Sequence, residues 1–280
     1  MSVSSISYIA YASGLHGADP GSGEGPHAFA TFLSIEHLWH AYIEPNQDHN
    51  HSIASAIDLN ESLSLATELC TMMQQPFVVI GGDHTCALGT WSGVSNALQQ
   101  TAIGMIWIDA HLDAHTPDTS PSGNIHGMPM AALLGHGHSG MTGLRHTQPK
   151  IDQHRLVYIG TRSFETEERA LLDDLGATIY DISTIEHKGL ATCIHEALDL
   201  IDANHMPFGI SLDLDVFDPQ YAPGVSCREP NGLSPQALLD AWPKDAPKPV
   251  GLEIVELHPD RDHNHQTTAL IQPLIDCLLT

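Results

Sequence analysis

The stretch Ile103-Gly-Met-Ile-Trp-Ile-Asp-Ala-His-Leu-Asp113 decides the fold class and points to the chemistry of this chain. Its first six residues are apolar or glycine, which is typical of a strand buried on both faces of a parallel sheet. The five residues that follow place Asp109, His111 and Asp113 at alternate positions directly after that strand. Alternate residues of an extended chain point the same way, so we expect these three side chains to share one face.

Seven further segments have strand character and alternate with segments of helical period. The predicted strands are Ile6–Ala12, Leu38–Ile43, Phe77–Ile80, Ile103–Ile108, Leu156–Gly160, Thr178–Ile182, Phe208–Leu212 and Pro249–Val255. The predicted helices are Glu61–Met73, Thr166–Leu175, Leu190–Ala203 and Thr267–Leu279. This alternation predicts a parallel sheet wrapped by helices, with an open sheet and a closed eight-stranded barrel as alternatives. Because no repeat or linker divides the chain, we expect one α/β domain over residues 1–280.

The composition excludes several classes of protein. Ten Lys and Arg residues against thirty-four Asp and Glu residues give a net charge of −24, which opposes binding to nucleic acid or to anionic lipid. No apolar run approaches the ~20 residues that a membrane span needs, and the N-terminus lacks the basic start of a secretory signal. The five cysteines are an odd number without CxxC spacing, so we expect no disulfide framework and a cytoplasmic location.

Three more strand ends carry side chains of the kind that bind metals. The sequence Gly81-Gly82-Asp83-His84 follows one buried strand, Asp213 and Asp215 follow another, and Glu256 follows the last. Because the C-terminal ends of parallel strands lie along one edge of a sheet, we expect all these side chains to meet in one crevice.

The charge of these residues indicates how many cations the crevice would hold. The candidate ligands are two imidazoles and four carboxylates, namely His84, Asp109, His111, Asp113, Asp213 and Asp215. Four negative charges balance two divalent ions, and burying that many carboxylates without cations would be strongly unfavourable. Oxygen and imidazole donors without thiolate suit Mn²⁺, with Co²⁺ or Fe²⁺ as alternatives. The sequence therefore predicts a site for two Mn²⁺ ions.

The motifs at these strand ends resemble those of the ureohydrolase family, which includes arginases, agmatinases and formiminoglutamases. They read GGDH, DAHLDAH, SLDLDVFDP and GLEIVELHP, and they follow the family order from about Ile80 to Ala269. The segment TSPSGNIHGMP at residues 119–129 is most similar to the arginase branch. The resemblance implies an arginase-like fold with a central eight-stranded, mostly parallel sheet. It also implies hydrolysis of a guanidino C–N bond, with L-arginine to L-ornithine and urea as the expected reaction, by a homo-oligomer of three or six chains.

The resemblance also assigns a role to each predicted ligand. His84 and Asp113 would bind one manganese ion, His111 and Asp215 the other, and Asp109 and Asp213 would bridge the two.

Three catalytic roles follow from the same resemblance. Asp113 would pass a proton to the departing amine, and His126 in the SGNIHG loop matches the proton shuttle of the family. Glu256 matches the carboxylate that pairs with the substrate guanidinium, for which a carboxylate is the natural bidentate partner.

Substrate recognition is where the sequence departs from the arginase pattern. His115 stands where arginases usually carry Asn, and the usual RDxD segment reads RSFE, which leaves Glu165 to hold an ammonium group. Three residues lie where arginases contact the α-carboxylate, namely Ser120, Ser122 and Asn124. The expected substrate contacts are thus His115, Ser120, Ser122, Asn124, Glu165 and Glu256. Agmatine, formiminoglutamate and other guanidino acids are the alternative substrates.

Two alternatives lie outside this reaction class. A two-metal phosphoesterase also places DxH at a strand end, but its GNH[DE] motif is interrupted here by Ile125, and the charge of −24 opposes anionic substrates. A non-catalytic metal-binding member of the family would keep the fold without turnover. The presence of all six candidate ligands together with His126 and Glu256 disfavours that alternative.

Overall fold

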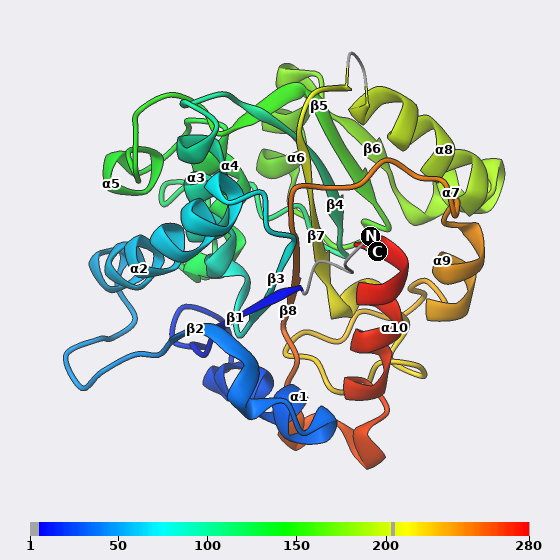
Figure 1. Cartoon of the computed structure of the whole chain (residues 1–280). Helices are drawn as coiled ribbons and strands as arrows, with labels where there is room; N and C mark the ends of the chain where they lie inside the picture. The colour runs from blue at the N-terminus through cyan, green and yellow to red at the C-terminus, as the bar shows by residue number, and fades with distance from the viewer. Residues whose placement is uncertain (1–5, 203–204, 280) are drawn as a thin grey trace.

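Eight parallel strands form one sheet in the order β2-β1-β3-β8-β7-β4-β5-β6 (Figure 1). This computed structural model describes residues 6–202 and 205–279. The strands are β1 (Ser7–Tyr11), β2 (Trp39–Ile43), β3 (Phe77–Gly81), β4 (Ile103–Ile108), β5 (Ile151–Ile159), β6 (Thr178–Tyr180), β7 (Phe208–Asp213) and β8 (Leu252–Val255). All eight predicted strands are present. The sheet is open, with β2 and β6 at its edges, so the barrel alternative is excluded and the arginase-like sheet is confirmed.

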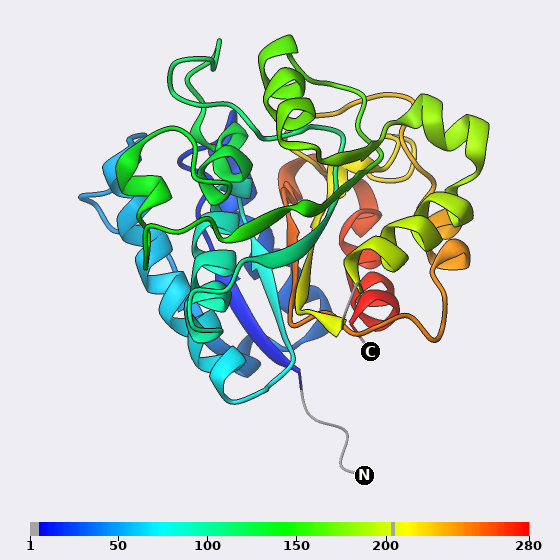
Figure 2. The ribbon, with the colours of Figure 1, turned by 90° about the horizontal axis from the view of Figure 1, so that it is seen from above.

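Helices cover both faces of the sheet. One face carries α2 (Ile53–Met72), α3 (Ala87–Ala97), α4 (Pro129–Leu133), α5 (Ser139–Thr142) and α6 (Thr166–Leu175). The other carries α1 (Gly25–Leu33), α7 (Ile182–Lys188), α8 (Leu190–Ile201), α9 (Pro235–Ala241) and α10 (Thr268–Leu278). In the view from above, α2 and α3 lie on the side opposite to α8 and α10 (Figure 2). Each layer buries its own apolar core against the sheet.

Two of the four predicted helices match the structure closely, whereas the predicted segment Glu61–Met73 misses the first two turns of α2. The predicted segment 166–175 coincides with α6, and 267–279 matches α10 to within one residue at each end. The predicted helix Leu190–Ala203 corresponds to α8, and its predicted end, Ala203, lies outside the described residues. Helix α3 was not predicted because it is buried on nearly every side, so its sequence lacks the amphipathic period by which surface helices are recognised.

Strand order brings the functional segments together. The four strands that end in candidate functional residues, β3, β8, β7 and β4, are consecutive neighbours in the sheet. All of them are buried along their whole length, so only the residues after their C-terminal ends are free to face a cavity. Within the described ranges, no helix has both the length and the apolar character needed to cross a membrane.

Candidate metal centre and substrate cavity

The predicted convergence of four strand ends is confirmed. His84 follows β3, Glu256 follows β8, Asp213 closes β7 and Asp109 follows β4, and these four side chains are all at most 3% exposed. Gly82 is required at the first of these ends, because a Cβ there would lie 2.2 Å from the backbone oxygen of Ser13. Glycine lets the chain after β1 press against the turn that carries His84.

The local geometry of two motifs differs from the extended chain that the spacing predicted. Strand β4 ends at Ile108, and Asp113 has a left-handed backbone with φ of 48°. After β7, a short 3-10 helix begins at Leu214. The alternate-face argument was therefore wrong for these residues. They still meet because the turns curl the chain back over the sheet edge, which brings Asp113 Oδ2 to 2.9 Å from His84 Nδ1.

His84 forms the centre of a first group of possible metal ligands. Its Nδ1 lies 3.3 Å from an oxygen of Asp109, 2.9 Å from Asp113 and 3.4 Å from Asp213. This nitrogen is buried, yet among the described residues it makes no well-directed hydrogen bond. A buried polar atom that faces three carboxylates and has no partner is the arrangement expected of a metal ligand.

His111 forms the centre of a second group. Its Nδ1 lies 3.1 Å from Asp215 Oδ2 and 3.5 Å from Asp109 Oδ1. Ligand atoms of Asp109, His111 and Asp215 all lie within 4.8 Å of one another, as do those of His84, Asp109 and Asp213. Asp109 thus belongs to both groups, so two cations held there would be neighbours.

The ionisation of these side chains shows how strongly the site favours positive charge. Burial opposes a proton on the imidazoles, but the carboxylates around them raise the pKa of His84 and of His111 well above 6.5. Burial raises the pKa of Asp215 to about 6, against the opposing effect of His111 and with a further contribution from Asp109. Without a metal ion, protons would therefore take the place of cations, so we expect metal binding to release them.

Trp107 holds both groups in place from behind. Its indole stacks on the ring of His84 at 4.2 Å between centroids and 7° between planes. The same indole donates from Nε1 to Asp109 Oδ2 at 2.9 Å. One rigid side chain of β4 thereby orients an imidazole of the first group and the carboxylate that the two groups share. The oxygen and imidazole donors, without a thiolate among them, fit hard or borderline divalent ions.

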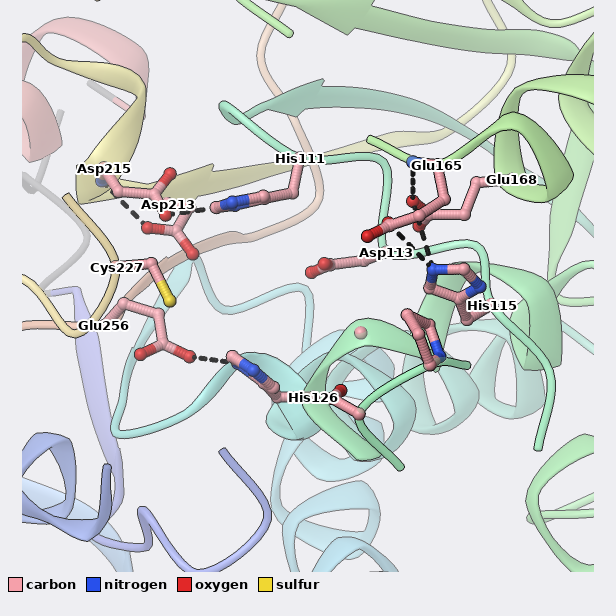
Figure 3. Close-up of a pocket in the computed structure, with 13 residues that line it drawn as sticks. His111, Asp113, His115, His126, Glu165, Glu168, Asp213, Asp215, Cys227 and Glu256 are labelled. Carbon is pink, nitrogen blue, oxygen red and sulfur yellow. Dashed lines mark hydrogen bonds and ion pairs between the residues drawn. The ribbon is translucent and has the colours of Figure 1, made fainter. Parts of the chain in front are cut away.

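The ligand groups lie at one end of a cavity of about 170 Å³ (Figure 3). Its wall contains His111, Asp113, His115, Pro121, Ser122, His126, Gly127, Glu165, Glu168, Asp213, Asp215, Cys227 and Glu256. In the close-up, Asp213, Asp215 and His111 face the cavity from one side, while His115 and the two glutamates near it face it from the other. Carboxyl groups therefore line the cavity at both ends.

Glu256 and His126 form one pair in the cavity wall. His126 Nδ1 lies 3.0 Å from Glu256 Oε1, which also accepts from the backbone N–H of His84 at 3.0 Å. Burial disfavours charge on His126, but the bond to Glu256 prevails and raises the pKa of the imidazole to about 9. Glu256 Oε2 is buried and has no hydrogen bond to the described residues. Glu256 also has a φ of 67°, a left-handed conformation that is uncommon outside glycine.

The opposite end of the cavity contains a carboxylate that the sequence analysis missed. Glu165 and Glu168 form the capping box of α6, in which each side chain accepts from the backbone N–H at the other's position. His115 Nε2 lies 3.0 Å from Glu165 Oε2 and 3.4 Å from Glu168 Oε2. The ExxE spacing before an apolar helix was the available signal for Glu168, because it marks a capping box.

The loop at residues 119–124 meets only part of its prediction. Ser122 lines the cavity, whereas Ser120 and Asn124 are outside its wall. Ser120 Oγ instead accepts from Gly123 N at 3.0 Å, and Ser122 Oγ accepts from Asn124 N at 3.2 Å. These contacts hold the turn of the loop, so Ser120 and Asn124 position it without facing the cavity. Cys227, which was not predicted as a site residue, lies in the wall near Glu256 (Figure 3).

Comparison with known proteins identifies the family of this chain. The model of the arginase family matches residues 14–280. The chain belongs to the arginase family. The arginase of Bacillus subtilis is 36% identical over 236 residues, which cover 84% of this chain and 79% of that protein. The arginase of Brevibacillus brevis is 34% identical over 248 residues, which cover 87% of this chain and 80% of that protein.

Solved structures of the family extend the agreement to the fold. The crystal structure of the Bacillus subtilis arginase superposes with a TM-score of 0.87 at 33% identity and covers 98% of both chains. An arginase from Entamoeba histolytica in complex with L-ornithine superposes with a TM-score of 0.83 at 26% identity, over 99% of both chains. As a member of this family, the chain is a metal-dependent hydrolase that cleaves a guanidino C–N bond.

Proposed function

We propose that this chain hydrolyses L-arginine to L-ornithine and urea with two Mn²⁺ ions. The observation that carries the proposal is the buried, unpartnered Oε2 of Glu256, which belongs to the cavity wall beside both ligand groups. A carboxylate oxygen in that position would accept an N–H of a guanidinium group. Two relatives over 30% identical are named arginases, and the Entamoeba arginase was solved with the amino-acid product of this reaction.

The metal ligands of the proposal are those of the two observed groups, with Asp213 added to the second group as the family resemblance implies. His84, Asp109, Asp113 and Asp213 would hold one ion, and His111, Asp109, Asp213 and Asp215 the other, with Asp109 and Asp213 shared. Bound divalent ions supply Lewis-acid activation of water at neutral pH. Carboxylate and imidazole donors suit Mn²⁺, and Co²⁺ and Fe²⁺ are the alternatives.

Proton transfer falls to residues of the cavity wall. His126 keeps its proton at neutral pH because its pKa is about 9, so it can deliver that proton to the departing amine. Asp113 lies within the same cavity and would take up the proton of the attacking water and relay it. Glu256 would hold the guanidinium carbon in reach of the water while its Oε1 stays bonded to His126.

The far end of the cavity would bind the amino-acid part of the substrate. Glu165 offers negative charge for an α-ammonium group, because its hydrogen bond with His115 lowers the pKa of its carboxyl. Burial raises the pKa of Glu168 to about 8, so this neighbouring carboxyl is mostly protonated at neutral pH, and His115 lies beside both side chains. Ser122, which lines the cavity, would donate to the α-carboxylate, and the turn formed through Ser120 and Asn124 would set its position. A site built to bond both groups discriminates against analogues that lack one of them.

One observation favours a second substrate class. Nε2 of His115 already bonds to Glu165, so part of the negative charge that an α-ammonium group would meet is satisfied within the protein. An ω-guanidino acid without an amino group would not need that charge. Such acids are therefore the second candidate substrate.

A panel of substrates tests the proposal. Mn²⁺-loaded protein would be assayed for urea release from arginine, agmatine and 4-guanidinobutyrate, and for formamide release from formiminoglutamate. We expect the highest kcat/KM with arginine. Ser122→Ala should lower kcat/KM for arginine and leave agmatine unchanged, because agmatine has no carboxylate. Faster turnover of agmatine or of guanidinobutyrate than of arginine by the wild type would show that the substrate assignment is wrong.

We also propose that the chain works in the cytoplasm as a homo-oligomer of three or six chains. All five cysteines are free thiols, which suits a reducing compartment. Four large apolar side chains of α2 and the residue after it are exposed by about half or more, namely Leu65, Leu69, Met72 and Met73. An apolar strip of this kind is typical of a surface that another chain covers. Light scattering coupled to gel filtration would measure the mass, and a monomer would contradict this proposal.

A further inference from the structure

A fully buried carboxylate lies behind the metal-ligand groups and takes no part in the proposed reaction. Glu253, in the middle of β8, is 0% exposed and belongs to neither ligand group. Its Oε1 accepts from Ser211 Oγ at 2.7 Å and from Trp91 Nε1 at 2.9 Å, and its Oε2 accepts from Cys86 Sγ at 3.7 Å. Burial raises the pKa of Glu253, and the nearby His84 together with the hydrogen bonds from Ser211 and Trp91 opposes this rise. Because the indole N–H of Trp91 can only donate, Oε1 is an acceptor.

Ser211 connects this carboxylate to a metal ligand. Ser211 and Glu253 are register partners on the adjacent strands β7 and β8, so their side chains leave the same face of the sheet side by side. On its other side, Ser211 Oγ lies 2.8 Å from His84 Nε2. A continuous chain of hydrogen bonds therefore runs from Glu253 through Ser211 to the ring of His84.

The direction of these bonds determines which nitrogen of His84 is free. The single hydroxyl proton of Ser211 is donated to Glu253 Oε1, and this oxygen does not donate in return because it already accepts from Trp91 Nε1. Ser211 Oγ must then accept from His84, so the ring carries its hydrogen on Nε2. In the neutral ring, Nδ1 is then left with its lone pair, and Nδ1 is the atom that faces Asp109, Asp113 and Asp213.

We propose that Glu253 is a positioning residue which, through Ser211, holds His84 in the tautomer that binds metal and increases the affinity of the site for its ion. The inference rests on the metal site of the proposed function. A carboxylate behind a ligating imidazole raises the basicity of that imidazole, and loss of such a partner typically weakens metal affinity by about 10–100-fold. His111 has a weaker counterpart, because its Nε2 lies 3.7 Å from Glu229, whose side chain is 29% exposed.

The substitution Glu253→Gln tests this role with little change of shape. A glutamine Oε1 can still accept from Ser211 and Trp91, but the negative charge is lost. We expect the dissociation constant of the Mn²⁺ ion that His84 would bind to rise by about 10–100-fold. Elemental analysis during dialysis against a chelator would measure the loss of Mn²⁺. The urea midpoint of the metal-free protein serves as the measure of purely structural effects.

Two companion variants separate the relay from a purely structural role of Glu253. Trp91→Phe removes the other hydrogen bond to Glu253 Oε1 but leaves the chain from Glu253 through Ser211 to His84 intact, so it should lower metal-free stability and leave metal affinity within about twofold. Ser211→Ala breaks the relay at its middle and should weaken metal binding as Glu253→Gln does. In the Ser211→Ala background, the further substitution Glu253→Gln should change metal affinity by less than about threefold, because the two act through one chain of bonds.

The outcomes distinguish this inference from the proposal beneath it. Wild-type protein that retains no metal would overturn the metal site and the inference together. Wild-type protein that retains metal, with unchanged affinity in Glu253→Gln or with its full effect persisting in the Ser211→Ala background, would overturn the relay alone. If Glu253→Gln fails to fold, unchanged metal affinity in Ser211→Ala would likewise overturn the relay.

Discussion

Replacing Asp215 with asparagine should stabilise the metal-free protein while it weakens metal binding. Asp215 is 2% exposed, and burial, opposed by His111 and reinforced by Asp109, raises the pKa of its carboxyl from 3.8 to about 6. Because this pKa is higher in the folded than in the unfolded chain, the ionised form is disfavoured in the fold. The contribution of Asp215 to stability is therefore fully present below about pH 4 and is lost as the pH rises through about 6.

The size of the effect follows from that shift. A difference of about two pKa units corresponds to about 3 kcal/mol at pH 7.5, where the carboxyl is ionised in both states. Asparagine has nearly the same shape as a protonated aspartate and can still accept from Ala110 N, which lies 3.3 Å from Asp215 Oδ1. In the presence of chelator we thus expect Asp215→Asn to be more stable than the wild type by about 3 kcal/mol at pH 7.5.

Urea unfolding followed by tryptophan fluorescence would measure this difference with EDTA and with Mn²⁺. In EDTA the advantage of the variant should shrink as the pH falls below 6. With Mn²⁺ the wild type should gain stability and the variant should gain much less, because it has lost one of its ligands. Asp240→Asn, at an exposed aspartate of α9, is the control and should change stability by less than about 0.5 kcal/mol. A variant less stable than the wild type in EDTA at pH 7.5 would refute the reasoning.

Three further predictions follow from the same structure. His16 is fully buried with both ring nitrogens unpartnered among the described residues, and burial lowers its pKa to about 4. Below pH 6.5 the unfolded chain therefore binds a proton that the folded chain does not bind. His16→Gln should remove about 3 kcal/mol of the stability loss between pH 7 and 4, and equal acid sensitivity of both proteins would contradict this. Asp109→Ala should abolish urea release and reduce the metal content below two ions per chain, whereas near-normal activity would show that Asp109 is not a shared ligand. Glu165→Gln should raise KM for arginine but leave 4-guanidinobutyrate unaffected, because the lowered pKa of Glu165 keeps its carboxylate charged and that acid has no ammonium group for it to bind; a parallel loss for both substrates would indicate a structural role.

Much of the site could be predicted because its signals are local. Side-chain type and position relative to an apolar run are visible in the sequence, and they marked His84, Asp109 and Asp213 as residues at strand ends. The loop contacts could not be predicted equally well. Ser120 and Asn124 carry side chains that could bind a carboxylate. In a turn, however, a hydroxyl often bonds to a nearby backbone N–H instead of to a ligand, as the bonds of Ser120 and Ser122 show.

By itself the sequence determined the eight strands, their parallel arrangement and the six candidate ligands, because apolar runs and turns act over a few residues. Tertiary structure alone decided how those pieces meet. Neighbouring places in the sheet set Ser211 beside Glu253, 42 residues later in the chain, and so connected a core carboxylate to His84. The left-handed turn at Asp113 replaced the extended geometry that the spacing predicted. Such contacts depend on strand order and on close packing, and neither can be predicted from the residues adjacent to a position in the sequence.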